Sequence, residues 1–337
     1  MDSWRLRPFL ADDFEAFHAI VSDYEVVKML GSWPFPAEAA FTRMRMETPE
    51  AKVGQVLVIE VDGAFAGTIG GMSRGIGYML GRAFWGRGIA TWAVREMVRR
   101  MFEGSNIGEV TASAWLDNAA SMRVLEKCGF RRSGAGEFYG KARGETLGYT
   151  DFSLSRADWA RAQPIDLQTD RLQIGALALS DAEDFSRILD DPNVAWMMGS
   201  ISTPFTKADA EQWIAARMEP DGIGCFAKIS LKDGTTIGFT RLSVGRLANS
   251  KKDFSIGYAI GKEFRGHGYA TEAMRAFIEK YMAVYALDRV SAGVMCDNPA
   301  SIRILEKLGF AKVGERMHLV KGRVEKARLL LYRKINH

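Results

Sequence analysis

The hydrophobic positions of this chain follow a strand period and then a helix period, and this order occurs twice. Residues 4–6 form a short predicted strand, and apolar positions in 14–20 lie on one helical face. The order returns with a strand at 171–174 and a helical face in 185–189. Each predicted helix follows an aspartate that can cap it. The pattern therefore predicts two copies of one domain.

Short β-branched or aromatic runs bounded by turn residues come next in each copy. The predicted strands are 55–61, 66–70 and 76–80 in the first copy, and 226–231, 236–242 and 254–260 in the second. A tight turn at 71–75 joins two of the strands in the first copy, whereas a longer basic hairpin is expected at 244–253 in the second. Each copy is thus expected to open with helices and then build an antiparallel sheet.

Two sequence blocks recur with one common spacing. IGYMLGRAFWGRGIATWA starts at Ile76 and DNAASMRVLEKCGF at Asp117, and their counterparts IGYAIGKEFRGHGYATEA and DNPASIRILEKLGF each start 180 residues later. Separated blocks that keep their spacing indicate that a whole domain was duplicated. A polar stretch around Pro164 predicts the boundary, which gives domains at 1–163 and 164–337.

Composition narrows the classes of function. The 337 residues are 47% hydrophobic, enough for two ordinary cores. A net charge of +4 without a dense basic run argues against a nucleic-acid surface. Three cysteines without CxxC spacing predict neither a disulfide framework nor a metal site. No apolar run is long enough for a membrane span or export signal, so we expect a cytoplasmic location.

The first block predicts a glycine-rich loop between a strand and a helix. Residues 265–270 read RGHGYA and precede a helical pattern at 271–282, and residues 85–90 read WGRGIA in the first copy. Glycines allow left-handed backbone and close ligand approach, so the N–H groups of the helix start can face a pyrophosphate. A single loop of this kind is more often a plain turn, but this one occurs twice.

The second block predicts a capped helix followed by a strand. Asn118 and Asn298 stand at the N-cap position, where they either only cap the helix or also contact a ligand. Pro299 suits the position after the cap. Gly129 and Gly309 mark the end of each helix.

With these motifs, the chain resembles the GCN5-related N-acetyltransferases (GNAT), in particular the RimJ/RimL-type branch that acetylates ribosomal protein N-termini. The phosphate signature of that family is Arg or Gln, two residues, Gly, one residue, then Gly or Ala. Arg265, Gly268 and Ala270 match it, and Trp85 replaces the arginine in the first copy. The pattern NxxSxRxLEKxGF is the second signature of the branch. The resemblance covers nearly the whole chain.

The resemblance implies an α+β fold, sandwich-like, of two tandem GNAT domains. Each would have a mixed, mostly antiparallel central sheet flanked by helices and splayed between its fourth and fifth strands. Acetyl-CoA, as co-substrate, would lie in the opening, where a backbone N–H can stabilise the oxyanion. The residues expected to contact it are Met79, Leu80, Arg87, Gly88, Ile89, Ala90, Thr91 and Asn118 in the first copy, and Ala259, Ile260, Arg265, Gly266, His267, Gly268, Tyr269, Ala270, Thr271 and Asn298 in the second.

The resemblance also implies direct acetyl transfer to an amine, with a proton donor for the leaving thiolate. Many relatives place a tyrosine on the helix of the second block, but Leu125 and Leu305 occupy that position here. Ser121 and Ser301, one turn inside the helix, are the candidate catalytic residues in its place. The alternative is that each serine only completes the first helical turn.

No general base stands out in the sequence. Asp253, Glu137 and Glu315 follow or precede the motifs, and each also fits a solvated surface charge. Deprotonation through water would need none of them. His267 in the loop and His318 on a predicted strand lack metal-ligand spacing.

Two hypotheses follow. The first is an N-acetyltransferase acting on a primary amine, either a protein N-terminus or a small molecule. The second is an acetyl-CoA-binding sensor or scaffold in which one or both copies have lost catalysis. Because a fused pair can replace the contact between subunits of single-domain relatives, a monomer is expected. The sequence leaves open the acceptor and whether both copies are active.

Overall fold

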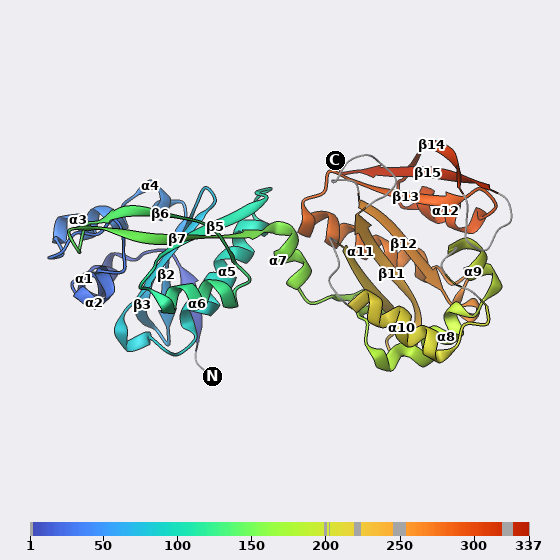
Figure 1. The fold of residues 1–337 in the computed structure, drawn as a ribbon, viewed down its shortest axis with the longest axis horizontal. Helices are drawn as coiled ribbons and strands as arrows, with labels where there is room; N and C mark the ends of the chain where they lie inside the picture. Colours follow the sequence, from blue (N-terminus) through green and yellow to red (C-terminus); the bar gives the residue numbers. More distant parts are fainter. Residues whose placement is uncertain are drawn as a thin grey trace. The chain divides into compact units, whose positions relative to one another are not determined.

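The computed structural model of the protein describes residues 3–198, 201, 203–218, 224–244, 254–318 and 326–336. The chain divides into two compact units, Met1–Trp159 (unit 1) and Ala160–His337 (unit 2), drawn in Figure 1. The division falls within helix α7 (Arg156–Ala162), shortly before Pro164. Most of the hairpin expected at 244–253 lies outside the described residues.

Unit 1 contains one seven-stranded mixed sheet. In chain order its strands are β1 (Trp4–Arg7), β2 (Val56–Val61), β3 (Ala64–Met72), β4 (Gly75–Leu80), β5 (Glu109–Trp115), β6 (Arg131–Gly140) and β7 (Glu145–Ser155). In the sheet they follow the order β1-β2-β3-β4-β5-β7-β6. Neighbouring strands are antiparallel except β4 and β5, which are parallel.

Unit 2 repeats this arrangement with one more strand. Its strands are β8 (Asp166–Gln168), β9 (Leu172–Ala176), β10 (Gly224–Leu231), β11 (Thr236–Val244), β12 (Phe254–Ile260), β13 (Arg289–Met295), β14 (Ala311–His318) and β15 (Ala327–Ile335). In the sheet they follow the order β14-β15-β13-β12-β11-β10-β9-β8. Again one pair, β12 and β13, is parallel. The predicted fold class, α+β with mostly antiparallel sheets, is confirmed.

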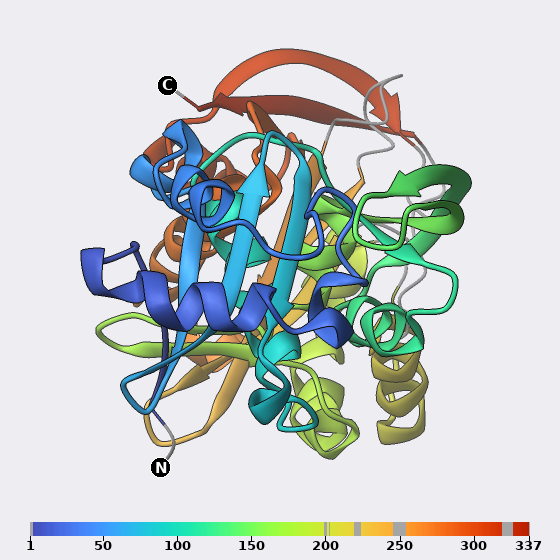
Figure 2. The same cartoon turned by 90° about the vertical axis from the view of Figure 1, so that its left-hand side faces the viewer.

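Helices flank both sheets, and Figure 2 shows the N-terminal helices of unit 1 in front of its strands. The helices of unit 1 are α1 (Phe14–Val21), α2 (Tyr24–Val27), α3 (Ala39–Met46), α4 (Pro49–Lys52), α5 (Ile89–Glu103) and α6 (Ala119–Lys127). Those of unit 2 are α8 (Ala182–Leu189), α9 (Pro192–Met198), α10 (Lys207–Met218), α11 (Tyr269–Tyr285) and α12 (Pro299–Lys307).

Two consecutive residues of β11 show that helices cover opposite faces of the unit 2 sheet. Phe239 packs against Trp213 of α10, with ring centroids 5.1 Å apart. The next residue, Thr240, has its hydroxyl 3.1 Å from the sulfur of Met274 on α11. Because successive side chains alternate between faces, α10 and α11 lie on opposite sides.

The apolar face predicted for α11 is buried. Met274, Phe277 and Ile278 are each at most 3% exposed, and the helix is longer than the predicted 271–282. The predicted aspartate caps are wrong in detail. Asp13 and Asp181 do not cap the α-helices with their side chains; each accepts a hydrogen bond from a backbone N–H three residues earlier and closes the preceding 3-10 turn.

Replacing Leu125 by Ala should lower the free energy of unfolding of unit 1 by about 2–5 kcal/mol, because a fully buried side chain is removed. Chemical denaturation followed by far-UV circular dichroism measures the loss. Arg123→Ala, exposed on the same helix, is the control and should change stability by less than about 0.5 kcal/mol. A loss of similar size in both variants would contradict the packing described for α6.

Candidate active site

Each sheet opens between its two parallel strands. β4 pairs with β5 at one position, Gly75 opposite Thr111. β12 pairs with β13 at two positions, with Ser255 opposite Ser291 as the last. Beyond these positions the strands separate, as the resemblance implied for the fourth and fifth strands; the extra strand β8 makes them the fifth and sixth in unit 2. The opening exposes one edge of β4 and of β12.

The peptide groups that face this opening in unit 1 belong to Tyr78 and Leu80. The carbonyl oxygen of Met79 points the other way, because a Cβ added to Gly67 on β3 would lie 2.1 Å from it. Peptide groups of adjacent residues alternate in direction along a strand. Tyr78 was not among the residues expected from the sequence, although it recurs in both copies of the IGY motif.

Unit 2 has the same alternation. A Cβ added to Gly238 would lie 2.2 Å from the carbonyl oxygen of Ala259, so the peptide groups of Tyr258 and Ile260 face the opening. Of the four strand positions expected to contact the cofactor through the backbone, Leu80 and Ile260 face the opening. Met79 and Ala259 face the neighbouring strand.

The glycine-rich loops have the backbone conformation that the sequence suggested. Gly86 and Gly88 have φ of 75° and 82°, and Gly266 and Gly268 have φ of 85° and 81°. These angles are strained for residues with a side chain. Gly88 and Gly268 are the N-caps of α5 and α11 and provide no side-chain cap. The first N–H groups of both helices therefore point into the loop. The Ile89 side chain is fully buried, which leaves only its backbone for a ligand.

Trp85 and Arg265 make the same hydrogen bond in the two units. The indole Nε1 of Trp85 donates to the carbonyl oxygen of Leu80 at 2.8 Å, and Nε of Arg265 donates to that of Ile260 at 3.0 Å. Arg265 also pairs with Asp191 through Nη2 at 2.7 Å. The signature arginine thus ties the loop to the end of its strand, and tryptophan does the same in unit 1.

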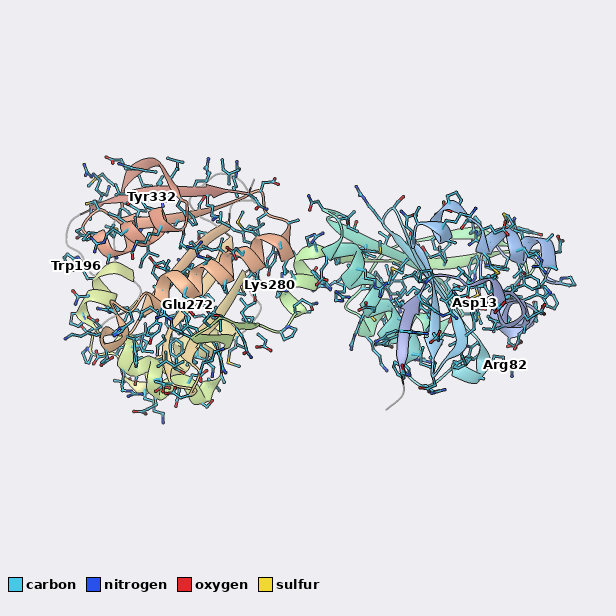
Figure 3. All side chains as sticks on the ribbon, turned by 180° about the vertical axis from the view of Figure 1, so that it is seen from behind. Asp13, Arg82, Trp196, Glu272, Lys280 and Tyr332 are labelled. Carbon is cyan, nitrogen blue, oxygen red and sulfur yellow. The ribbon has the colours of Figure 1, made fainter. Side chains whose placement is uncertain are left out.

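The first turn of α11 in unit 2 and of α5 in unit 1 is held to the start of its sheet, and the contacts differ between the two units. In unit 2, Glu272 on α11 (Figure 3) accepts hydrogen bonds from the Thr169 hydroxyl at 2.6 Å and from Nε of Arg171 at 2.7 Å. Burial opposes the ionised form, but these bonds outweigh it and hold the pKa of Glu272 below its ordinary value. In unit 1, Trp4 packs edge to face on Trp92, at the position equivalent to Glu272.

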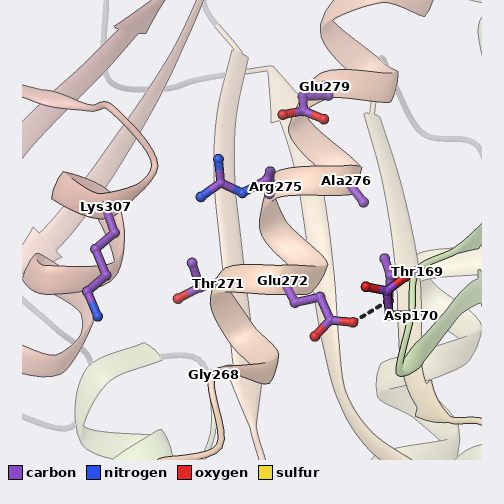
Figure 4. Close-up of a pocket in the computed structure, with 9 residues that line it drawn as sticks. All are labelled: Thr169, Asp170, Gly268, Thr271, Glu272, Arg275, Ala276, Glu279 and Lys307. Atoms are coloured by element: carbon purple, nitrogen blue, oxygen red, sulfur yellow. Dashed lines mark hydrogen bonds between the residues drawn. The ribbon is translucent and has the colours of Figure 1, made fainter.

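A pocket of about 560 Å³ adjoins the N-terminal half of α11. Its lining residues are Thr169, Asp170, Gly268, Thr271, Glu272, Arg275, Ala276, Glu279 and Lys307. Figure 4 shows Thr271 and Arg275 on the side of α11 toward Lys307, and Glu272 on the other side. The pocket thus extends from Gly268 in the glycine loop to the cationic side chains of Arg275 and Lys307.

The same cation pair occurs in unit 1, 180 residues earlier, as Arg95 and Lys127. There, Nη2 of Arg95 donates to the carbonyl oxygen of Lys127 at 3.0 Å. Neither pair was identified from the sequence. Lys127 and Lys307 lie in the second repeated block, and Arg95 and Arg275 lie two residues beyond the end of the first.

The second block forms the expected capped helix. The side-chain oxygens of Asn118 and Asn298 accept from the backbone N–H of Ser121 and Ser301 at 3.0 and 3.1 Å. The capping role of both asparagines is therefore confirmed.

Ser121 also contacts a tyrosine that was not predicted from the sequence. Its Oγ lies 2.8 Å from the hydroxyl of Tyr78, which reaches α6 from β4. Burial raises the pKa of Tyr78 to about 12, so this hydroxyl is neutral at physiological pH. A neutral hydroxyl pair therefore spans from β4 to α6, while Leu125, at the position of the family's tyrosine, is buried in the core.

Unit 2 contains the same two residues without the same bond. The hydroxyl of Tyr258 is buried and has no hydrogen-bond partner among the described residues. Burial raises the pKa of Tyr258 to about 12, and the nearby Ser301 hydroxyl opposes that rise only in part.

The candidate bases lie apart from this arrangement or outside the described residues. Glu315 is on the surface, where a hydrogen bond from Lys312 lowers its pKa. Glu137 and His318 are exposed, and Asp253 is outside the described residues. No group of three metal-ligating side chains was found in the part of the chain that the structure describes.

The acetyltransferase (GNAT) domain model matches residues 4–131 and 171–311. The chain belongs to this family and is an acetyltransferase with two GNAT domains. The resemblance stated from the two motifs, and the duplication, are thereby confirmed. Among the described residues, no helix has the length and apolar character needed to span a bilayer.

Similar proteins match one copy or part of one. The uncharacterized N-acetyltransferase p20 of Bacillus licheniformis is 29% identical over 169 residues, which cover 46% of this chain and 94% of that protein. The probable N-acetyltransferase YjcK of Bacillus subtilis is 35% identical over 98 residues, which cover 29% of this chain and 54% of that protein.

Solved structures of similar fold include a spermidine N-acetyltransferase from Vibrio cholerae in complex with CoA and spermine. It is 13% identical, covers 50% of this chain and 96% of its own, and has a TM-score of 0.43. The ribosomal-protein-S5-alanine acetyltransferase from Vibrio fischeri is 23% identical, with 51% and 97% coverage and a TM-score of 0.43.

Replacing Glu272 by Gln should destabilise unit 2 by about 1–3 kcal/mol at neutral pH, because hydrogen bonds to a charged group are lost. The pKa of Glu272 in the folded protein lies below its unfolded value near 4.5. The stabilisation is therefore present above that pH and is lost as the pH falls through the folded pKa.

Thermal unfolding at pH 7 and at about pH 3 checks this prediction. The difference in melting temperature between the wild type and Glu272→Gln should shrink at the lower pH. Glu279→Gln, exposed on the same helix, should show no comparable difference at either pH. A difference in melting temperature that is the same at both pH values would contradict the ionic contact of Glu272.

Proposed function

We propose that the protein transfers the acetyl group of acetyl-CoA directly to a primary amine. One observation carries the proposal. In each unit, a strand edge faces an opening in the sheet and leads into a loop of two left-handed glycines at an uncapped helix start. Such an arrangement can bind an extended chain along the strand and phosphates at the helix.

The residues present fit this co-substrate. The carbonyl oxygens of Tyr78 and Tyr258 would accept hydrogen bonds from pantetheine amides, and the N–H groups that follow Gly88 and Gly268 would bind the pyrophosphate. The cation pairs, Arg95 with Lys127 and Arg275 with Lys307, would bind a further phosphate of the nucleotide. Arg87 and His267 of the glycine loops are exposed and could contact the same phosphates.

The chemistry needs little from the protein besides position and polarity. The amine attacks the thioester carbonyl carbon, a C–N bond forms, the C–S bond breaks, and the ammonium proton passes to water. A backbone N–H at Tyr78 stabilises the oxyanion. Ser121 donates its proton to the leaving thiolate and regains one from water, and the Tyr78 hydroxyl holds Ser121 in place.

The amine itself is a protein N-terminus or a small molecule. A second candidate, acetyl-CoA binding without turnover, applies to unit 2, where the Ser301 hydroxyl lies near that of Tyr258 but without the hydrogen-bond geometry of Ser121 and Tyr78 in unit 1.

Gly88→Glu and Gly268→Glu should each abolish acetyl-CoA binding in one unit, because a carboxylate would occupy the anion position and the backbone would be strained. Calorimetry should give two sites in the wild type, one in each variant and none in the double variant. Gly54→Glu, just before β2 in unit 1, and Gly234→Glu, in the β10–β11 turn of unit 2, introduce the same strain outside the glycine loops and should leave binding intact.

Release of free CoA with a panel of peptides, polyamines and amino acids tests turnover. Acetylation of at least one amine is expected, and it should disappear in the double variant. Tight acetyl-CoA binding with no acetylation of any amine would reject the enzyme and favour the sensor or scaffold.

Ser121→Ala should lower kcat of unit 1 by about 10–100-fold with little change in the KM for acetyl-CoA, because only the proton donor is removed. Tyr78→Phe should lower kcat less. Both are measured in the Gly268→Glu background, so that unit 1 alone turns over. An unchanged kcat in Ser121→Ala would leave the serine with only the role of completing the helix turn.

A further inference from the structure

A row of three residues crosses the unit 2 sheet on the face covered by α10. Phe226 on β10 lies opposite Arg241 on β11, and Arg241 lies opposite Gly257 on β12. Phe239 precedes Arg241 by two residues, and its ring packs on Trp213 of α10, which fixes the face. The row therefore ends at the strand that borders the opening.

The Arg241 side chain lies across Gly257. A Cβ added to Gly257 would be 2.6 Å from Nε of Arg241 and 3.3 Å from its Cγ. Its Nη1 donates to the Ser243 hydroxyl at 3.0 Å, and that hydroxyl is 3.3 Å from the hydroxyl of Ser255. Ser255 is the last residue of β12 that pairs with β13. The guanidinium thus sits where the opening begins.

The charge of Arg241 has no ionic partner within the described ranges. Its side-chain acceptor is the neutral Ser243 hydroxyl. Burial lowers the pKa of Arg241, because a guanidinium loses hydration inside the protein. A guanidinium has five N–H donors in a planar fork that matches a carboxylate. As far as the described residues go, donors and charge are therefore left for a ligand.

Unit 1 has no charge at the equivalent place. Val56, Gly70 and Gly77 form the corresponding row, and a Cβ added to Gly77 would meet no atom within 4 Å. In both units, the last residue of the row directly precedes the tyrosine whose peptide group faces the opening, Tyr78 or Tyr258. One guanidinium thus distinguishes the two units next to the expected thioester.

We propose that Arg241 makes unit 2 selective for an amine acceptor that carries a carboxylate. The guanidinium binds the carboxylate and holds the amine at the opening, whereas a polyamine, with its extra positive charge, is repelled. The proposal rests on the acetyl transfer proposed above. Unit 1 has no such preference.

The test measures kcat/KM of the Gly88→Glu protein, in which unit 2 alone binds acetyl-CoA. The acceptors are straight-chain ω-amino carboxylates of increasing length, each paired with the n-alkylamine of the same length. We expect at least a tenfold preference for the acid in one pair. Arg241→Gln should bring that ratio close to one without changing the KM for acetyl-CoA, and Arg241→Lys should keep part of the preference.

Lys280→Gln removes the same charge from an exposed position on α11 (Figure 3) and should leave the ratio unchanged. Equal rates within every pair, or an unchanged ratio in Arg241→Gln, would overturn the selectivity while acetyl transfer stands. Circular dichroism checks that each variant is folded. If Arg241→Gln does not fold, the ratio is measured in Arg241→Lys instead.

Absence of turnover with every amine would instead count against acetyl transfer in unit 2. Calorimetric titration of the CoA-loaded Gly88→Glu protein with the same amino carboxylates then decides the inference. Binding that is lost in Arg241→Gln supports the site, and no binding overturns it.

Discussion

The break in pairing between β4 and β5, and between β12 and β13, is the constraint on which the rest of each unit depends. It leaves peptide groups of Tyr78, Leu80, Tyr258 and Ile260 without a strand partner. A buried backbone group without a hydrogen bond costs about 1–3 kcal/mol. The sheet can therefore stay open only if side chains, water or a ligand satisfy these groups.

In each unit one of these groups is satisfied within the protein, and the donor differs between the units. The Leu80 carbonyl accepts from the Trp85 indole and the Ile260 carbonyl from the Arg265 guanidinium. Each side chain places an N–H donor at about the same position, but only the arginine is charged. The geometry of the hydrogen bond, and not the charge, is therefore common to the two units. This explains how tryptophan can replace the arginine of the phosphate signature without changing the loop.

Features that depend on neighbouring residues were predictable from the sequence, and features that depend on strand pairing were not. The left-handed glycines and the asparagine caps follow from local backbone needs, so Gly88, Gly268 and Asn118 were found. Tyr78 meets Ser121 from a different element, 43 residues away. Arg241 lies over Gly257 only because of the β11–β12 register, which the sequence does not specify.

Side chains alternate between the two faces of β12. The residues on one face are similar in the two units, and those on the other face differ. Tyr258 and Ile260 direct their side chains to the α11 face, and unit 1 has Tyr78 and Leu80 at the same positions. The other face of β12 carries Ser255 and Ala259, where unit 1 has Gly75 and Met79, and it also carries Arg241 across Gly257. A duplicated domain can therefore change its acceptor on one face of the strand. The opposite face keeps the tyrosine and its serine, which the proposed chemistry requires in both units.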